Sequence, residues 1–303
     1  MSQVVVLTAD PARARAGRSP LDPSIAAAVR AVLAAGGSAA AEVDWLAAGI
    51  ACDIPIGVAD PDRAAAAARA ALGDAPVDAN VVANSGRRKR LLVADMESTL
   101  IENEMLDDLA AMAGIGAKVA GITRRAMNGE LEFGEALRER VALLAGLPAR
   151  RVDEAARAIR LVPGAAILAH TMKAHGAFTA IVSGGFRCFT GRVRERLGFD
   201  WDEGNDLEIA AGALTGGVRE PVLARDAKAA ALHRLAAERG IPLRDCLAVG
   251  DGANDLPMLE AAGLGVAFRP KPAVAAAARL RIAHRDLTAL LYLQGYRQGE
   301  LVD

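Results

Sequence analysis

The fold is decided by the sequence LLVADMEST, residues 91–99. Its first four residues are all apolar, which is typical of a strand buried on both faces of a sheet. Two carboxylates, Asp95 and Glu97, follow at once. Such a density of negative charge at the end of a buried strand is costly unless a cation or a reacting group uses it. The stretch therefore predicts a chemical site at the carboxyl end of a central strand.

Two later apolar runs also end in polar residues. Phe178 to Val182 precedes Ser183-Gly184-Gly185, a hydroxyl with backbone N–H groups that suit an anion. Cys246 to Val249 precedes GDGAND, residues 250–255, which carries two carboxylates among glycines. Lys228 lies between these runs, at the start of a predicted helix.

These runs and residues 265–268 alternate with helical segments, which predicts an α/β fold with a doubly wound parallel sheet. The carboxyl ends of such strands converge on one crevice. A helical insertion at roughly residues 102–160 follows the first strand, where a lid over an active site would lie. We therefore expect a small helical cap on the sheet.

The first 85 residues read as strand, helix, two strands, helix and strand. This order predicts a small ferredoxin-like or ACT-like α+β domain. It carries no catalytic constellation, so docking or homodimerisation is favoured over amino-acid sensing. The basic residues 87–90 that follow are interpreted as a solvated linker, with nucleic-acid binding as the weaker alternative.

The composition narrows the class of protein. The chain has 303 residues, 52% hydrophobic and 24% charged, and a formal net charge of -1. No global field favours nucleic acid or an anionic membrane, so local groups must hold a charged substrate. We expect Cys52, Cys188 and Cys246 to be reduced and buried. No signal pattern or spanning apolar run is present, and we expect a cytoplasmic protein.

Acidic groups for Mg²⁺, a hydroxyl and a lysine for phosphate, and a spare carboxylate nucleophile together favour phosphoryl transfer. Alone, Asp95-x-Glu97 is more typical of a solvated turn, and residues 250–255 could be an ordinary loop. Their order after three separate buried strands favours the site.

From about residue 90 to 295 the chain resembles the phosphoserine phosphatases of the haloacid dehalogenase superfamily. Four motifs carry this resemblance: Asp95, Ser183-Gly184-Gly185, Lys228 and residues 250–255. The insertion resembles the family's helical cap at Glu104, Ile122-Thr123, Ala126-Met127, Gly129-Glu130, Phe133, Arg140-Val141 and Leu143 to Leu147. The resemblance implies a phosphatase domain at 86–303 with the cap inserted at about 102–160, and the strand and helix pattern predicts a separate accessory domain at 1–85.

The resemblance also implies catalytic roles. Asp95 would be the nucleophile and would form an aspartyl phosphate. Mg²⁺ would be held by Asp95, the backbone carbonyl of Glu97, Asp251, and Asp255 directly or through water. Ser183, the Gly184 N–H and Lys228 would bind the phosphoryl oxygens, and Asn254 would orient Lys228 or the substrate.

Substrate choice would come from the cap. Phosphoserine carries an ammonium and a carboxylate, so a selective pocket needs a buried acid, Glu104, and a base, Arg140. The alternative for this pair is a helix-surface ion pair. Met127 and Phe133 would shield the pocket, or simply form cap core.

Glu97 departs from the resemblance, since the family usually has Asp there. That residue would protonate the leaving oxygen and then activate water. The extra methylene moves the carboxyl group by about 1.5 Å, and misplacement by ~1 Å can cost of order a hundredfold in rate. An adapted pocket, a slow enzyme and a non-catalytic relative are all open, although the other site residues favour activity.

The function expected is Mg²⁺-dependent hydrolysis of phosphoserine, the last step of serine biosynthesis. The alternatives are a phosphatase for another small phospho-amino acid, such as phosphothreonine, and a non-catalytic phospho-amino-acid binding protein. We expect a small-molecule substrate and no nucleic-acid or membrane partner. A homodimer through the N-terminal domain is possible.

Overall fold

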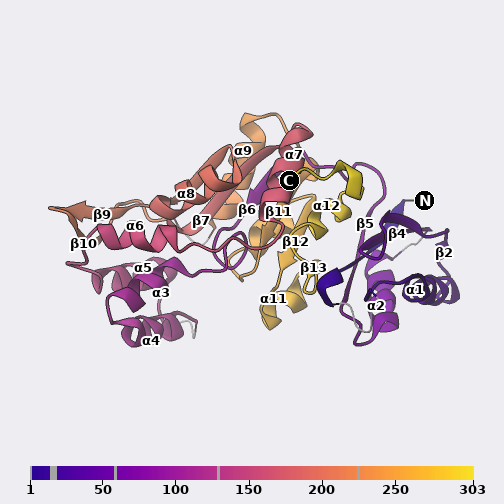
Figure 1. Cartoon of the computed structure of the whole chain (residues 1–303), viewed down its shortest axis with the longest axis horizontal. Coiled ribbons are helices and arrows are strands. Elements are labelled where there is room, and N and C mark those ends of the chain that lie inside the picture. Colours follow the sequence, from indigo (N-terminus) through magenta and orange to yellow (C-terminus); the bar gives the residue numbers. More distant parts are fainter. Residues whose placement is uncertain (1, 14–18, 58–59, 128–129, 224–225) are drawn as a thin grey trace.

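A computed structural model describes residues 2–13, 19–57, 60–127, 130–223 and 226–303, with only the backbone of Met127 (Figure 1). Its centre is a six-stranded parallel sheet in the order β13-β12-β11-β6-β7-β8. The strands are β6 (Leu91–Ala94), β7 (Phe178–Phe186), β8 (Trp201–Asn205), β11 (Cys246–Gly250), β12 (Leu264–Phe268) and β13 (Leu280–Ile282). The predicted doubly wound parallel sheet is confirmed.

Helices cover both faces of this sheet. Alternate residues of β6 face opposite ways, so that Leu92 packs toward one set of helices and Leu91 toward the other. The first set is α7 (Ala165–Ala174), α8 (Arg187–Leu197) and α12 (Ala289–Leu293). The second is α9 (Ala227–Glu238), α10 (Leu256–Ala261) and α11 (Pro272–Ala277). Burial on both faces explains why β6 is wholly apolar.

The helical cap forms a lobe at the carboxyl edge of the sheet (Figure 1). It consists of α3 (Met105–Met112), α4 (Gly116–Met127), α5 (Phe133–Ala142) and α6 (Arg150–Arg157). A hairpin of β9 (Leu207–Ala210) and β10 (Ala213–Val218) joins this lobe, because Gly146 donates its backbone N–H to the carbonyl of Leu214 at 2.9 Å.

The sequence did not predict this hairpin or the edge strands β8 and β13. The sequence of β8 is WDEGN, whose acidic, glycine and asparagine residues are depleted in strands. Its pairing with β7 therefore comes from its place in the sheet and not from local preference.

The first 83 residues form a second sheet with two helices. Its elements are β1 (Gln3–Ala9), α1 (Pro23–Ala35), β2 (Ala39–Ala40), β3 (Asp44–Ala47), β4 (Ala51–Gly57), α2 (Pro61–Leu72) and β5 (Val77–Ala83). The antiparallel order is β2-β4-β1-β5, with β3 also on β4. Short 3₁₀ turns lie at Pro11–Arg13, Leu243–Asp245 and Gln298–Glu300. The predicted order of strand, helix, two strands, helix and strand is confirmed, except that the two-residue strand β2 was not predicted.

Both faces of this N-terminal sheet are buried. Val5 and Leu7 of β1 pack with α1 and α2, while Val4 and Val6 belong to the core cluster that contains Leu290 of α12. The five residues of α12 are all buried, as expected of a helix that is apolar all round. The N-terminal sheet and the body built on the central parallel sheet therefore share one hydrophobic core.

The interpretation of residues 87–90 as a solvated linker is wrong for Arg87. Its side chain is 9% exposed, forms an ion pair with buried Asp53, and donates to the carbonyls of Tyr292 and Leu293 at 2.9 and 3.1 Å. A buried guanidinium is tolerated when it is paired and hydrogen-bonded in this way. Arg88 stacks on Tyr296, 4.2 Å from the ring centroid. This segment therefore connects the N-terminal sheet to the region of α12.

The sequence also led to expectations about the cysteines and about membrane-spanning segments. Cys52 and Cys246 are free and buried as expected, but Cys188 is exposed, so its predicted burial is wrong. No helix within the described ranges combines the length and apolar character needed to cross a membrane.

Candidate active site

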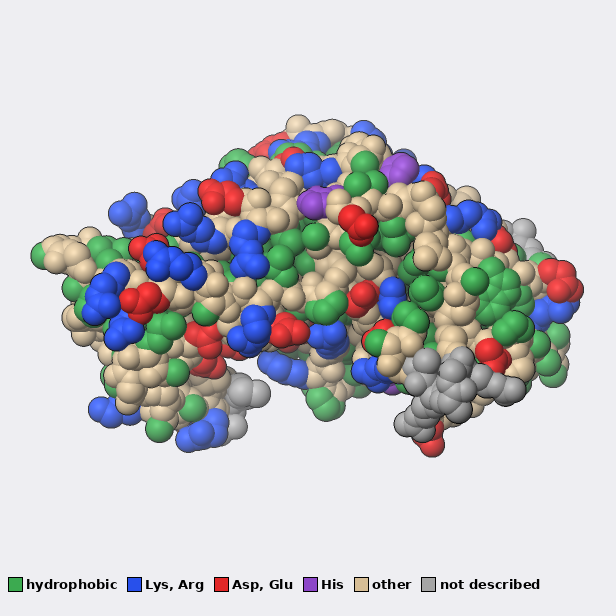
Figure 2. Space-filling view, viewed as in Figure 1, with side chains coloured by type: hydrophobic (Ala, Val, Ile, Leu, Met, Phe, Trp, Pro, Cys, Tyr) green, Lys and Arg blue, Asp and Glu red, His purple; other side chains and the backbone are tan. Residues whose placement is uncertain are grey.

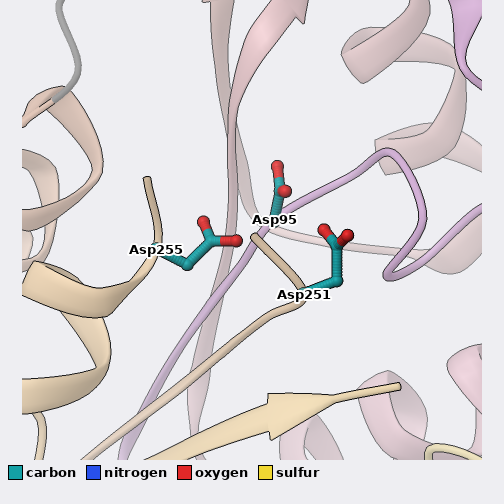
Figure 3. A group of neighbouring side chains, drawn as sticks. All are labelled: Asp95, Asp251 and Asp255. Atoms are coloured by element: carbon teal, nitrogen blue, oxygen red, sulfur yellow. The ribbon is translucent and has the colours of Figure 1, made fainter. Parts of the chain in front are cut away.

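Three aspartates gather at the carboxyl edge of the central sheet (Figure 3). Asp95 directly follows β6, and Asp251 and Asp255 follow β11. The ladder between β6 and β11 pairs Ala94 with Val249, so both strands end at the same level. One carboxylate oxygen from each aspartate lies within 4.8 Å of the others, and all three residues are buried. The parallel register therefore brings together carboxylates that are about 155 residues apart in sequence.

Lys228 joins this group from the first turn of α9. Its Nζ atom lies 2.8 Å from Asp95 Oδ1 and 2.5 Å from Asp255 Oδ1, in a buried position. The second oxygen of Asp255 accepts the backbone N–H of Gly252 at 2.9 Å. Asp255 is thus held in place beside Lys228, and Asn254, expected to orient Lys228 or the substrate, lines the pocket.

The electrostatics of the cluster favour an added cation. Burial raises the pKa of Asp95 to about 7, with Lys228 opposing and Asp255 adding to the rise. Burial and Asp255 likewise raise the pKa of Asp251 to about 6. Burial lowers the pKa of Lys228, but the two aspartates outweigh it and the net pKa is raised. Crowded carboxylate oxygens at elevated pKa suit a hard divalent cation, whose charge relieves their repulsion.

Glu97 reaches away from the aspartates toward the cap. Its Oε1 atom accepts the backbone N–H of Met105, the first residue of α3, at 2.8 Å. Its Oε2 atom lies 2.8 Å from where a side chain on Gly185 would begin, so a larger residue there would displace the Glu97 carboxylate. Burial, and secondarily the charge of Glu104, raise the pKa of Glu97 to about 8. In this state Glu97 holds a proton at neutral pH.

The end of β7 supplies the anion-binding side of the site. Ser183 is buried, and its Oγ accepts the backbone N–H of Gly185 at 3.0 Å. A Cβ on Gly184 would lie 2.8 Å from Cζ of Phe133, so the cap ring rests directly on this glycine. Close approach of the cap therefore depends on a residue without a side chain at position 184.

Asn205, which the sequence did not single out, holds this loop in place. Its Nδ2 donates to the carbonyl of Gly184 at 2.8 Å, and its Oδ1 accepts the N–H of Leu223 at 2.8 Å. The residue is buried at the carboxyl end of β8. A polar residue at the carboxyl end of a strand could have marked Asn205 as a site residue. The sequence did not predict β8, so this signal was missed.

These groups line one pocket of about 350 Å³ between sheet and cap. It brings together most of the residues singled out from the sequence: Asp95, Glu97, Glu104, Phe133, Arg140, Ser183, Gly184, Lys228, Asp251 and Asn254. Asp255 lies behind Lys228, fully buried. The side chain of Met127 lies outside the described residues. The lining also includes Thr123, one of the cap residues that carry the resemblance, and Asp107 and Lys271, which the sequence did not single out.

The acid and base of the cap differ from expectation in their burial. Glu104, expected to be buried, is exposed and accepts the Ser98 hydroxyl at 2.7 Å. Arg140 is half-buried, and its Nε donates to the carbonyl of Ala136 at 3.1 Å. Burial lowers the pKa of Arg140, although Asp107, Glu97 and Glu104 oppose this. Within the described part of the chain Arg140 forms no ion pair, so the helix-surface ion pair is not present.

The comparison with known proteins follows this geometry. A family model described as haloacid dehalogenase-like hydrolase matches residues 92–260, more than half of the chain. The chain belongs to this family. The match spans the sheet from β6 to α10 and includes all four motifs. Haloacid dehalogenase-like phosphatases use a divalent metal, and Asp95, Asp251 and Asp255 are a group of described residues that could hold one.

Individual relatives are phosphoserine phosphatases. The chain is 46% identical over 215 residues to phosphoserine phosphatase SerB2 of Mycobacterium tuberculosis, covering 71% of this chain and 53% of that protein. It is 45% identical over 203 residues to the phosphoserine phosphatase of Lactococcus lactis, covering 67% of this chain and 94% of that protein. The chain thus spans about half the length of the mycobacterial relative.

One solved structure is similar to this chain over nearly its whole length. It is the unliganded form of a probable phosphoserine phosphatase from Vibrio cholerae, with a TM-score of 0.79 and 30% identity. The match covers 99% of this chain and 88% of that one. The N-terminal sheet is therefore part of an architecture that this structure shares.

Proposed function

We propose that the chain hydrolyses O-phospho-L-serine to L-serine and phosphate with Mg²⁺, the final step of serine biosynthesis. The observation that carries this is a single pocket that joins the Asp95–Lys228 pair to Arg140 and Glu104 of the cap. One end suits a phosphate group and the other suits an α-amino acid. The names of the relatives agree with this assignment.

In the first step an oxygen of Asp95 attacks phosphorus, and the bond from phosphorus to the serine oxygen breaks. Glu97, protonated at neutral pH, gives its proton to the departing serine oxygen. Lys228, the Ser183 hydroxyl and the Gly184 N–H hold the phosphoryl oxygens as charge shifts onto them. The product is an aspartyl phosphate on Asp95 and free serine.

In the second step Glu97, now ionised, takes a proton from water as the water oxygen attacks phosphorus. The bond from phosphorus to Asp95 breaks, phosphate leaves, and both carboxyl groups return to their starting states. Glu97 lies beside both the aspartate and the cap, so one side chain can serve in both steps.

We assign the metal site to Asp95, the backbone carbonyl of Glu97, Asp251, and Asp255 directly or through water. The elevated pKa values of Asp95 and Asp251 support it, since a cation would relieve their repulsion. When bound, Mg²⁺ neutralises charge on the phosphate and so lowers the cost of bringing a carboxylate to it.

We assign substrate reading to the cap. Arg140 carries no ion pair within the described ranges, so its guanidinium is available for the carboxylate of the substrate. Glu104 faces the same pocket and suits the ammonium group. Phe133 rests on Gly184 and would exclude water from the phosphate end.

We propose residues 1–85 as an accessory domain and 86–303 as the phosphatase domain, with the cap at about 102–160, in a cytoplasmic protein. Because both faces of the N-terminal sheet are covered, a homodimer through this domain would use the outer surface of α1 and α2. Exposed Val32 on α1 belongs to that surface. Light scattering after gel filtration measures the oligomeric state.

The function is tested by phosphate release from phosphoserine, phosphothreonine and phosphoethanolamine, with Mg²⁺ and with excess chelator. We expect phosphoserine to have the highest kcat/KM and chelator to abolish turnover. Asp95→Asn is the control, because an amide cannot act as the nucleophile. Turnover of phosphoethanolamine equal to that of phosphoserine would overturn the substrate assignment, and full activity in Asp95→Asn would overturn the mechanism.

A further inference from the structure

A second cavity, of about 570 Å³, lies where the N-terminal sheet meets the phosphatase body. Its walls come from α2 and β5 on one side and from α11, β13 and the loop after β12 on the other. Strand β13 contacts β5, and Figure 1 shows α11 and β13 on the side of the central sheet that faces α2 and β5. The side chains that line it include Arg69, Asp78, Arg269, Arg281 and His284.

The cavity has rigid walls, because polar side chains of β5 pair with the backbone of the body. Asn80 donates to the carbonyl of Arg281 and accepts its N–H, both at 2.9 Å. Asp78 accepts the N–H groups of Ala283, His284 and Arg285 at 2.8 to 3.2 Å. Two side chains thus fix β5 along the edge of the central sheet beside β13.

The cavity also has an excess of positive charge. Arg69 donates to the carbonyls of Ala79 and Arg279, and Arg281 to that of Ala275. These bonds orient the guanidinium groups but leave their charge uncompensated, and each guanidinium has five N–H donors. Among the residues that the structure describes, Arg69, Arg269 and Arg281 form no ion pair. Asp78 lines the cavity and the charge of Asp62 also acts on Arg69, so together they offset only part of the charge of the three arginines.

The like charges act on one another. Burial lowers the pKa of Arg69, and the nearby charge of Arg281 lowers it further. Holding two guanidinium groups together in a half-buried cavity costs free energy that a bound anion would recover. The planar guanidinium group of arginine binds carboxylate and phosphate in bidentate fashion.

We propose that this seam cavity binds a small, doubly charged oxyanion, a phosphate group or a dicarboxylate, through the guanidinium groups of Arg69, Arg269 and Arg281. The negative charge of such a ligand complements the positive surplus of the cavity. The volume exceeds that of the active-site pocket, so a ligand larger than inorganic phosphate also fits.

The seam cavity has a short path to the active site. Arg269 and Pro270 line the cavity, and the next residue, Lys271, lines the active-site pocket with its Nζ 3.9 Å from Asp251 Oδ2. An anion that holds Arg269 would therefore restrain the position of Lys271 beside the carboxylates. This second step rests on the proposed function, whereas the binding step does not.

Calorimetric titration with inorganic phosphate and with succinate, in excess chelator at constant ionic strength, tests the proposal. Variants are Arg269→Gln, which removes no hydrogen bond of the seam, and the double variant Arg69→Gln/Arg281→Gln. The matched control is Arg63→Gln, an exposed arginine of the same helix that does not line the cavity. Phosphate that binds the active site contributes equally to all four proteins.

We expect wild type and Arg63→Gln to bind at least one of the two anions in the cavity. Arg269→Gln should bind it at least about tenfold more weakly, as loss of a hydrogen bond to a charged group predicts, and the double variant should not bind it there. Binding of phosphate alone identifies a phosphate site, and binding of succinate identifies a dicarboxylate site. Equal affinities for both anions in wild type and Arg269→Gln, or no binding beyond the active site, would overturn the proposal. Neither result depends on phosphatase activity.

Discussion

The Oε1 atom of Glu97 accepts a hydrogen bond from the backbone N–H of Met105, at 2.8 Å. This bond joins the loop after β6 to the first turn of α3 and uses one of the N–H groups that a helix leaves unpaired at its start. A side chain one methylene shorter would stop short of Met105 in the same backbone position. Of the three interpretations of Glu97, the structure favours a pocket adapted to glutamate.

Glu97→Gln tests the proton-transfer role. Glutamine keeps the length of the side chain and an oxygen that can accept the Met105 N–H, but it cannot exchange a proton. We expect kcat for phosphoserine to fall at least about a hundredfold, within the usual 10²–10⁴ range for a general acid–base. Steady-state phosphate release measures it. A variant as fast as wild type would remove Glu97 from the mechanism.

Glu97→Asp separates an adapted pocket from a merely slow enzyme. The shorter acid loses the bond to Met105 and withdraws the proton from the leaving oxygen, so we expect kcat to fall about tenfold or more. Circular dichroism should show an intact fold. An increase in kcat would mean that glutamate is a handicap in this pocket.

The pKa of Glu97 gives a pH-dependent stability difference. Its pKa rises from 4.5 to about 8 in the folded metal-free protein, so its contribution is fully present below pH 4.5 and is lost as the pH rises through 8. Glu97→Gln has no such loss. We expect the Tm of this variant to gain about 2 °C or more on wild type between pH 5 and 9 in chelator, measured by thermal melts. If the difference in Tm between Glu97→Gln and wild type stays constant with pH, the pKa of Glu97 in the folded protein is near its ordinary value.

Gly184→Ala tests the contact between the cap and the phosphate end. The new Cβ would lie 2.8 Å from the ring of Phe133, and such overpacking typically costs about 1–3 kcal/mol. We expect kcat/KM to fall between about fivefold and a hundredfold. Phe133→Leu provides the space, so the double variant should recover part of the loss. If the double variant is as impaired as Gly184→Ala alone, the defect lies in the loop and not in the cap contact.

Arg140→Ala tests the reading of the substrate carboxylate. Breaking such a pair typically costs about 2–5 kcal/mol, so kcat/KM for phosphoserine should fall at least about thirtyfold. Phosphoethanolamine lacks the carboxylate and should be affected far less. Equal losses on both substrates would assign Arg140 to support of the cap.

Local pattern was enough to predict the core of the fold and the group of site residues that the structure brings together. Four apolar residues before Asp95 marked a central strand, and parallel sheets bring strand ends into one place. The contacts that the sequence did not reveal join residues far apart in the chain. Asp255 to Lys228 and Asn205 to Gly184 depend on the positions of two elements at once.

The burial of Arg87 also depends on residues far away in the chain, and here the local sequence led to a wrong prediction. A run of basic residues is usually solvated, and nothing in its neighbours distinguishes Arg87 from Arg88. Its burial depends on Asp53 in the N-terminal sheet and on the carbonyls that end α12, about 200 residues further along. Only the assembled core determines which arginine is desolvated.

The shared core around α12 also affects synthesis of the chain on the ribosome. The face of the N-terminal sheet with Val4 and Val6 is covered by α12, which is translated about 200 residues after β5. At about 5–20 residues per second, that apolar face waits roughly 10–40 s for its partner. During this interval the face of the nascent sheet that carries Val4 and Val6 is exposed to solvent. Exposed apolar surface of this kind is what chaperones bind. Completion of this sheet therefore waits for α12, although its own strands are translated earlier.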